Sequence, residues 1–209
     1  MQIPEDWLGR KIFEGIDEPP LGDKMETYYG IPDHPNVNLK GYYQTPEALA
    51  YLSIEKIREW LKIKKEHLDV FSTKKEGYYV AAHLRRGDYL FQAHRNRYCL
   101  ISRSSYLRCC DKYGIDKSKI VWVQDNKDPR IRNYRSDVSF LKDFLFLMNA
   151  DVLLRANSTF SFWAGVLGDC KVYSPHVFGK KGLTHVDFLE GNSESILEAS
   201  NEGLYIKQK

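Results

Sequence analysis

Residues 78–88 read YYVAAHLRRGD, and they join an apolar stretch directly to a charged one. The apolar part is rich in β-prone residues, which predicts a buried strand. Arg85 and Arg86 follow where this strand should end. A guanidinium there is costly unless an anion meets it, and arginine binds phosphate through two parallel hydrogen bonds. The pair is therefore a candidate diphosphate clamp, with His83 and Asp88 as flanking hydrogen-bonding groups.

The same residues also allow a structural interpretation. Arg85 and Arg86 can instead form ion pairs with Asp88 and other local carboxylates, and thereby stabilise the end of the strand. Residue types alone support the two interpretations about equally.

Apolar segments alternate with helical patterns downstream of this strand. The pattern predicts further strands at 120–123, 151–156 and 171–175, and helices near 105–113, 138–149 and 160–167. Gly114 suits the end of the first of these helices. Alternation of this kind is typical of an α/β fold, here a Rossmann-like parallel sheet with helices on both faces.

Ligands of such sheets bind beyond the carboxyl ends of the strands. Asn157, Ser158, Thr159 and Ser161 lie between the strand at 151–156 and its following helix. Backbone N–H groups at a helix N-terminus, together with hydroxyls, form an anion site. Ordinary capping by Ser158 or Thr159 is the alternative. Two anion sites after neighbouring strands favour a diphosphate ligand.

Asp143 interrupts an otherwise apolar helical segment. A carboxylate on this helix can face the ligand edge of the sheet and accept two N–H bonds from a guanine ring. The alternative is a position that faces solvent. Asp125, at the end of the strand at 120–123, is a weaker candidate.

The first third of the chain has a different character. Residues 1–40 are rich in Pro, Gly, Asp and Asn. Residues 38–44 predict a short strand with a polar end. Residues 47–71 predict one or two amphipathic helices, and Thr45 can cap the first of them. We therefore expect a reduced N-terminal region at 1–72 and a Rossmann-like ligand-binding domain at 73–209.

Composition narrows the class of protein. The net charge of +3 over 209 residues is too small to indicate a nucleic-acid partner by itself. The sequence contains no apolar run long enough to span a membrane, no signal-peptide pattern and no clustered metal ligands. Four cysteines without a disulfide pattern favour a reduced, cytoplasmic protein. A luminal domain cut from a longer protein would look similar.

Several segments together resemble a known family. Residues 83–89 (HLRRGDY) are similar to the His-x-Arg-Arg-x-Asp motif of the α1,2-fucosyltransferases, which α1,6- and protein O-fucosyltransferases share. Residues 143–148 (DFLFLM), Asp151 and residues 157–164 (NSTFSFWA) resemble the second and third motifs of the α1,2 family. Residues 39–44 (LKGYYQ) resemble the segment that precedes them. Order and spacing agree across about residues 37–175.

The resemblance implies a GT-B-type fold, GDP-fucose as donor, no metal or other cofactor, and inversion at the sugar carbon. Arg85 would grip the β-phosphate, His83 and Asp143 would contact the guanosine, and Thr159 and Ser161 would complete the phosphate site. Such an enzyme stabilises its leaving group with positive charge and N–H dipoles. Asp88 is a candidate general base. The family's Trp-Trp pair is Phe162-Trp163 here, and the N-terminal half that mostly binds the acceptor is short.

Several functions therefore remain open. The first is a fucosyltransferase acting on a hydroxyl of a glycan acceptor. A transferase for another nucleotide sugar is the second, and a non-catalytic sugar-nucleotide-binding module of a larger glycosyltransferase is the third. A nucleic-acid-binding domain is the least supported, because no basic and aromatic residues interleave on one face.

Overall fold

The computed structural model describes residues 25–26, 38–39, 53–71, 76–90, 98–124, 134–135, 140–177 and 179–192. The chain divides into two compact units, one of residues 1–72 with 206–209 and the other of residues 73–205. Each unit is considered by itself.

The first unit contains short elements. Strands β1 (Met25–Glu26) and β2 (Asn38–Leu39) pair in parallel. Helices α3 (Ile54–Trp60) and α4 (Lys65–Phe71) follow, and the Ser53 hydroxyl caps α3 by accepting the Lys56 N–H at 3.1 Å. Over its described part, residues 53–71, the helical pattern predicted for 47–71 corresponds to two helices. The predicted cap at Thr45 and the polar end of the strand at 40–44 lie outside the described residues.

The second unit is built on a six-stranded sheet. Its order is β10-β8-β7-β3-β5-β6, and every neighbouring pair is parallel except β10 with β8. The strands are β3 (Val80–Leu84), β5 (Ile120–Gln124), β6 (Tyr134–Arg135), β7 (Val152–Leu154), β8 (Lys171–Pro175) and β10 (Phe188–Glu190). The α/β class and the mostly parallel sheet are confirmed. The four strands that the sequence predicted pair in parallel, and β10, which it did not predict, adds an antiparallel strand at one edge.

The order of the strands contains one reversal. From β3 the chain adds β5 and β6 on one side, and it then adds β7, β8 and β10 on the other side of β3. This is the order of dinucleotide-binding doubly wound sheets, in which ligands bind where the direction of winding reverses. The reversal lies between β3 and β7.

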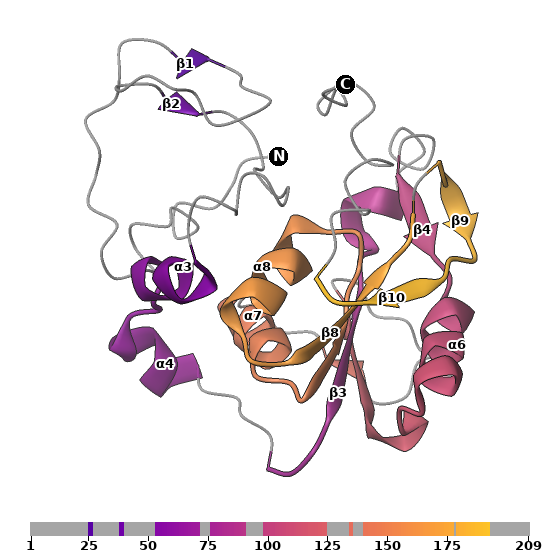
Figure 1. Cartoon of the computed structure of the whole chain (residues 1–209), viewed down its shortest axis with the longest axis horizontal. Coiled ribbons are helices and arrows are strands. Elements are labelled where there is room, and N and C mark those ends of the chain that lie inside the picture. Colours follow the sequence, from indigo (N-terminus) through magenta and orange to yellow (C-terminus); the bar gives the residue numbers. More distant parts are fainter. Residues whose placement is uncertain are drawn as a thin grey trace. The chain divides into compact units, whose positions relative to one another are not determined.

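Helices cover both faces of this sheet, as predicted. Figure 1 shows α7 (Phe140–Met148) and α8 (Thr159–Leu167) on one face and α6 (Arg103–Tyr113) on the other. Helix α6 ends at Gly114, whose φ of 66° is left-handed and whose N–H bonds to the Cys110 carbonyl, as the sequence predicted.

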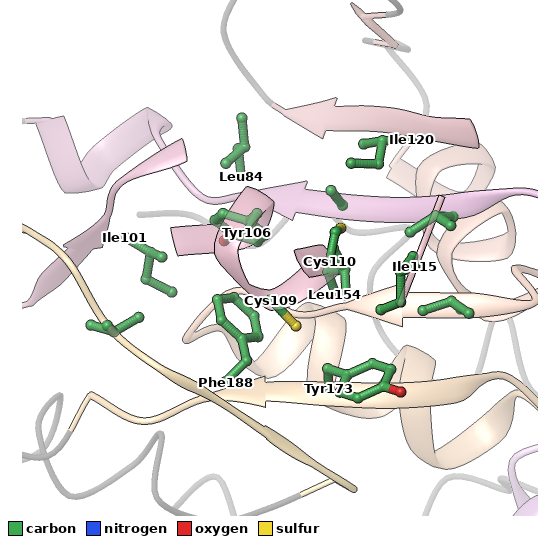
Figure 2. Packing of buried hydrophobic residues seen from close by; sticks show 14 of the residues in the cluster. Leu84, Ile101, Tyr106, Cys109, Cys110, Ile115, Ile120, Leu154, Tyr173 and Phe188 are labelled. Atoms are coloured by element: carbon green, nitrogen blue, oxygen red, sulfur yellow. The ribbon is translucent and has the colours of Figure 1, made fainter. Parts of the chain in front are cut away.

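The core follows the two-residue period of the strands. Val80, Ala82 and Leu84 of β3 belong to a buried cluster with Tyr106 and Cys109 of α6, part of which Figure 2 shows. The alternate residues of β3 point to the opposite face. Burial raises the pKa of the Cys109 thiol to about 12, so this cysteine stays protonated at neutral pH.

Helices α7 and α8 approach closely where both end. A Cβ atom on Gly168, which follows α8, would lie inside van der Waals contact of the Met148 carbonyl oxygen and 2.9 Å from the Ala164 carbonyl oxygen. Only glycine therefore fits at this position without displacing the backbone.

A second pair of strands was not predicted. Strand β4 (Cys99–Ile101) pairs in parallel with β9 (Gly182–Thr184) outside the main sheet. Of the helices that the structure describes, none is both apolar enough and long enough to cross a bilayer.

Candidate functional site

The reversal between β3 and β7 brings two of the sequence-predicted segments together. Ala82 of β3 lies opposite Leu154 of β7, so the residues that follow these strands leave the sheet side by side. The Tyr89 hydroxyl, from the segment after β3, donates to the Asn157 carbonyl, from the segment after β7, at 3.1 Å. The site is therefore made of these two segments.

His83 stands on the face of β3 that α8 covers. Its ring lies 5.6 Å from the ring of Phe160, and only 5% of the residue is exposed. Burial, followed by the nearby charges of Arg85, Arg155 and Arg86, lowers the pKa of His83 to about 3. Its Nδ1 atom has no hydrogen-bond partner among the described residues. At neutral pH, His83 is thus a neutral ring with an unused polar atom.

The two arginines after β3 are placed differently from one another. Arg85 is half-buried, and its guanidinium carbon lies 5.4 Å from the centre of the Tyr89 ring. Arg86 donates to the Arg85 carbonyl at 3.1 Å and to the Ile101 carbonyl of β4 at 2.8 Å. Arg86 therefore holds β4 against the end of β3, whereas Arg85 lies next to the Tyr89 ring.

Two of the predicted donor-binding side chains form hydrogen bonds that stabilise the fold. The Asn157 amide donates to the Cys99 carbonyl of β4 at 2.9 Å. The Ser161 hydroxyl, fully buried, lies 3.2 Å from the Ala156 carbonyl and 3.3 Å from the Ser158 carbonyl. These bonds fix the turn between β7 and α8, so both residues shape the site through its backbone.

The side chain of its own capping residue does not cap the N-terminus of α8. Ser158 is the capping residue, but its hydroxyl makes no capping hydrogen bond. The first intrahelical bond runs from the Phe162 N–H to the Ser158 carbonyl at 3.0 Å. The earlier N–H groups of the first turn have no intrahelical acceptor, and the helix dipole makes them attractive to an anion. Thr159, half-buried, is the first residue of this turn.

Asp143 lies in the first turn of α7 and is half-buried. Its neighbour Phe144 contacts Phe160 with ring centres 5.3 Å apart, and Phe160 in turn contacts His83. The start of α7 is thus linked to the site through two aromatic rings. Asp88 lies in the short 3-10 helix η2 (Gly87–Leu90), after the arginines, and Asp125 lies outside the described residues.

Sequence reasoning missed two residues of this region. The Tyr106 hydroxyl, from α6, donates to the His83 carbonyl at 2.7 Å and so fixes the end of β3. Arg155 directly follows β7 and is completely buried. An arginine within the apolar run at 151–156 was visible in the sequence, and the position of a charge in such a run was the signal that could have found it.

The arrangement suits a polyanion. Arg85 and Arg155 supply positive charge, α8 supplies the N–H groups of its first turn, and His83 supplies an uncharged polar ring that contacts α8. Charge-assisted hydrogen bonds to such groups are worth roughly 1.5–3 kcal/mol each.

Comparison with known proteins identifies a family for most of the chain. Residues 19–173 match the family described as glycosyl transferase family 11. Searches of curated proteins and of solved structures give no match.

Proposed function

Since this chain belongs to glycosyl transferase family 11, we propose that it moves fucose from GDP-fucose to a hydroxyl of a carbohydrate acceptor. The family itself implies a fucosyltransferase that uses GDP-fucose, with a sugar-nucleotide donor and a glycan acceptor. The observation that carries the proposal is that the segment after β3, which holds half-buried Arg85, contacts the segment that leads into α8 through the Tyr89–Asn157 hydrogen bond, at the reversal of the sheet.

The proposed transfer needs groups that stabilise the negative charge developing on the leaving GDP. In our proposal the acceptor oxygen forms a bond to the anomeric carbon of fucose while the bond from this carbon to the β-phosphate oxygen breaks, so the configuration inverts. Arg85 and the α8 N–H groups stabilise the departing GDP, and no metal is required. Asp88 takes the proton of the acceptor hydroxyl.

The nucleotide and the acceptor would occupy different parts of a GT-B architecture. Residues 73–209 would bind GDP-fucose, with His83 and Asp143 at the guanosine and Thr159 at the phosphates. Residues 1–72 would form a reduced acceptor side. Neutral, buried His83 supports the guanosine role, because an uncharged ring can hydrogen-bond a base without attracting a second phosphate.

Calorimetric titration with GDP, GDP-fucose and UDP tests the donor. We expect binding of both guanosine nucleotides and at least about 10-fold weaker binding of UDP. Arg85→Ala should weaken GDP binding and reduce turnover by about 100-fold or more. Lys119→Ala is the matched control, since it removes one exposed positive charge beside the amino end of β5. Absence of GDP binding by the unaltered protein would rule out the proposal.

A donor screen on an acceptor glycan array tests the transfer itself. Fucose should move only from GDP-fucose, the product linkage should have the anomeric configuration opposite to the donor's, and EDTA should leave the rate unchanged. Asp88→Asn should reduce turnover while GDP affinity is retained. Transfer of another sugar would replace fucose in the proposal, and binding without any transfer would favour a non-catalytic module.

A further inference from the structure

Arg155 is a buried cation without a hydrogen-bonding partner in the described part of the chain. Its exposed fraction is 0%, and its Nε, Nη1 and Nη2 atoms are all buried without a hydrogen bond. The guanidinium carbon lies 4.9 Å from the centre of the Phe162 ring. A contact with an aromatic face compensates only part of the loss of hydration.

Burial does not remove the charge. Desolvation lowers the pKa of Arg155 to about 9, so the side chain is still protonated at neutral pH. A buried charge without a partner destabilises a protein, and replacement by an apolar residue of similar volume is often neutral or stabilising. Folding alone therefore does not account for an arginine at this position.

The position of Arg155 indicates what could compensate its charge. It follows β7 at the reversal of the sheet, and the register that pairs Ala82 with Leu154 puts it beside His83 of β3. The positive charge of Arg155 is also one of the causes that lower the pKa of His83. His83 also has an unpartnered, buried Nδ1 atom.

The helix above the same face adds a third feature. Phe160, in the first turn of α8, contacts His83, and Phe162, in the same helix, contacts Arg155. The Ser158 hydroxyl makes no capping hydrogen bond at the N-terminus of this helix. A guanidinium without a hydrogen bond and an imidazole nitrogen without a partner thus lie on the face of the sheet that α8 covers. The guanidinium and the helix N-terminus both attract negative charge.

We propose that Arg155 is a second anion-binding residue of this site, which attracts the donor's diphosphate from the sheet side while Arg85 contacts it from the segment after β3. The inference rests on the proposed function, because that function supplies the diphosphate. A buried charge acts through a medium of low dielectric, so Arg155 contributes even where atoms of Phe162 intervene. In the free protein its charge is uncompensated, and nucleotide binding neutralises it.

The test compares Arg155→Met with the unaltered protein in calorimetric titrations of GDP and of guanosine. We expect GDP to bind at least about 10-fold more weakly to the variant, which corresponds to about 1.4 kcal/mol, and guanosine to bind with nearly unchanged affinity. The melting temperature of the ligand-free variant should be equal or higher. Arg108→Met, which removes an exposed guanidinium from α6 together with its 3.5 Å hydrogen bond to the Val186 carbonyl, is the control and should leave GDP affinity unchanged.

Arg155→Lys separates the effect of the charge on GDP binding from the effect of side-chain packing. It also provides a test if Arg155→Met fails to fold. The lysine variant should retain most of the GDP affinity, because it keeps the charge. If the unaltered protein binds GDP and Arg155→Met binds it equally well, or if folded Arg155→Lys loses the affinity although it keeps the charge, Arg155 does not act through its charge and the inference is wrong. If the unaltered protein does not bind GDP, the proposed function has failed instead.

Discussion

The two ends of the same sheet differ in how completely their polar groups are paired. At the amino ends of the strands, Asp151 accepts the Tyr79 N–H on its carboxylate at 2.8 Å, donates its own N–H to the Tyr79 carbonyl at 3.2 Å, and accepts the Lys171 N–H on its carbonyl at 2.9 Å. One residue thus links β3, β7 and β8. At the carboxyl ends, His83 and Arg155 keep buried polar atoms without partners in the described chain.

This difference indicates which end of the sheet stabilises the fold and which end binds the ligand. Unpaired buried polar groups cost free energy, and proteins retain them where function requires them. We therefore expect substitutions at the amino end to lower the free energy of unfolding without changing GDP affinity, and substitutions at the carboxyl end to alter ligand binding or its pH dependence.

The largest effect on stability is expected from Gly168→Ala, where α7 and α8 end near the amino edge. The new methyl group would overlap the Met148 carbonyl oxygen, so the backbone must shift. We expect a loss of about 3 kcal/mol in urea unfolding. Gly179→Ala is a control that meets no atoms within 4 Å, although its φ of 67° adds some strain. Loss of GDP affinity in folded Gly168→Ala would contradict the expectation that substitutions at the amino end change stability alone.

Asp151→Ala should lower the free energy of unfolding by about 2 kcal/mol, because the buried Tyr79 N–H loses its acceptor. Urea unfolding measures this loss. Asp111→Ala, which removes an exposed carboxylate on α6, is the matched control and should change the value little. GDP titration of folded Asp151→Ala should match that of the unaltered protein.

His83 predicts a pH dependence of stability. It gains its proton near pH 3 in the folded protein and near the ordinary value of 6.5 in the unfolded chain. Between these values the unfolded state binds more protons, so stability falls as the pH drops below about 6.5, by at most roughly 1.4 kcal/mol per pH unit. Unfolding of His83→Gln across this range should show a shallower slope than unfolding of the unaltered protein. Equal slopes would mean that His83 titrates normally.

The smallest effect is expected from Tyr106→Phe. This change removes the hydroxyl that donates to the His83 carbonyl at 2.7 Å and should cost about 1 kcal/mol. Because His83 belongs to the carboxyl end, GDP affinity should also decrease by a small factor, and turnover should follow it. Tyr113→Phe, which removes a 3.1 Å bond to the Phe188 carbonyl elsewhere on α6, is the control and should leave GDP affinity unchanged.

The parts of the fold that follow local patterns were predictable. The strands beginning near 80, 120, 152 and 171 and the helices between them agree with the apolar periods and with Gly114 as a helix end. Strands β4, β9 and β10 have three residues each, and their pairing depends on contacts distant in sequence, so no local period indicated them.

The candidate site was predictable as a set of residue types after particular strands. The sequence identified His83, Arg85 and the segment at 157–161, which the fold brings together. It did not indicate that the Asn157 and Ser161 donors are used by main-chain carbonyls, because those carbonyls belong to backbone that only the folded turn brings near. The burial of Arg155 likewise depends on α8, which lies over it.

The central position of β3 has a consequence for folding. This strand is synthesised before its sheet neighbours, and it pairs with β5 on one edge and with β7 on the other. Between Leu84 and Leu154 the ribosome adds 70 residues, which takes about 4–14 s at about 5–20 residues per second. During this interval an apolar strand has an open edge, which can pair with other chains. We therefore expect chaperone dependence during synthesis to be greatest for nascent chains that end between these two strands, which limited proteolysis of stalled chains can measure.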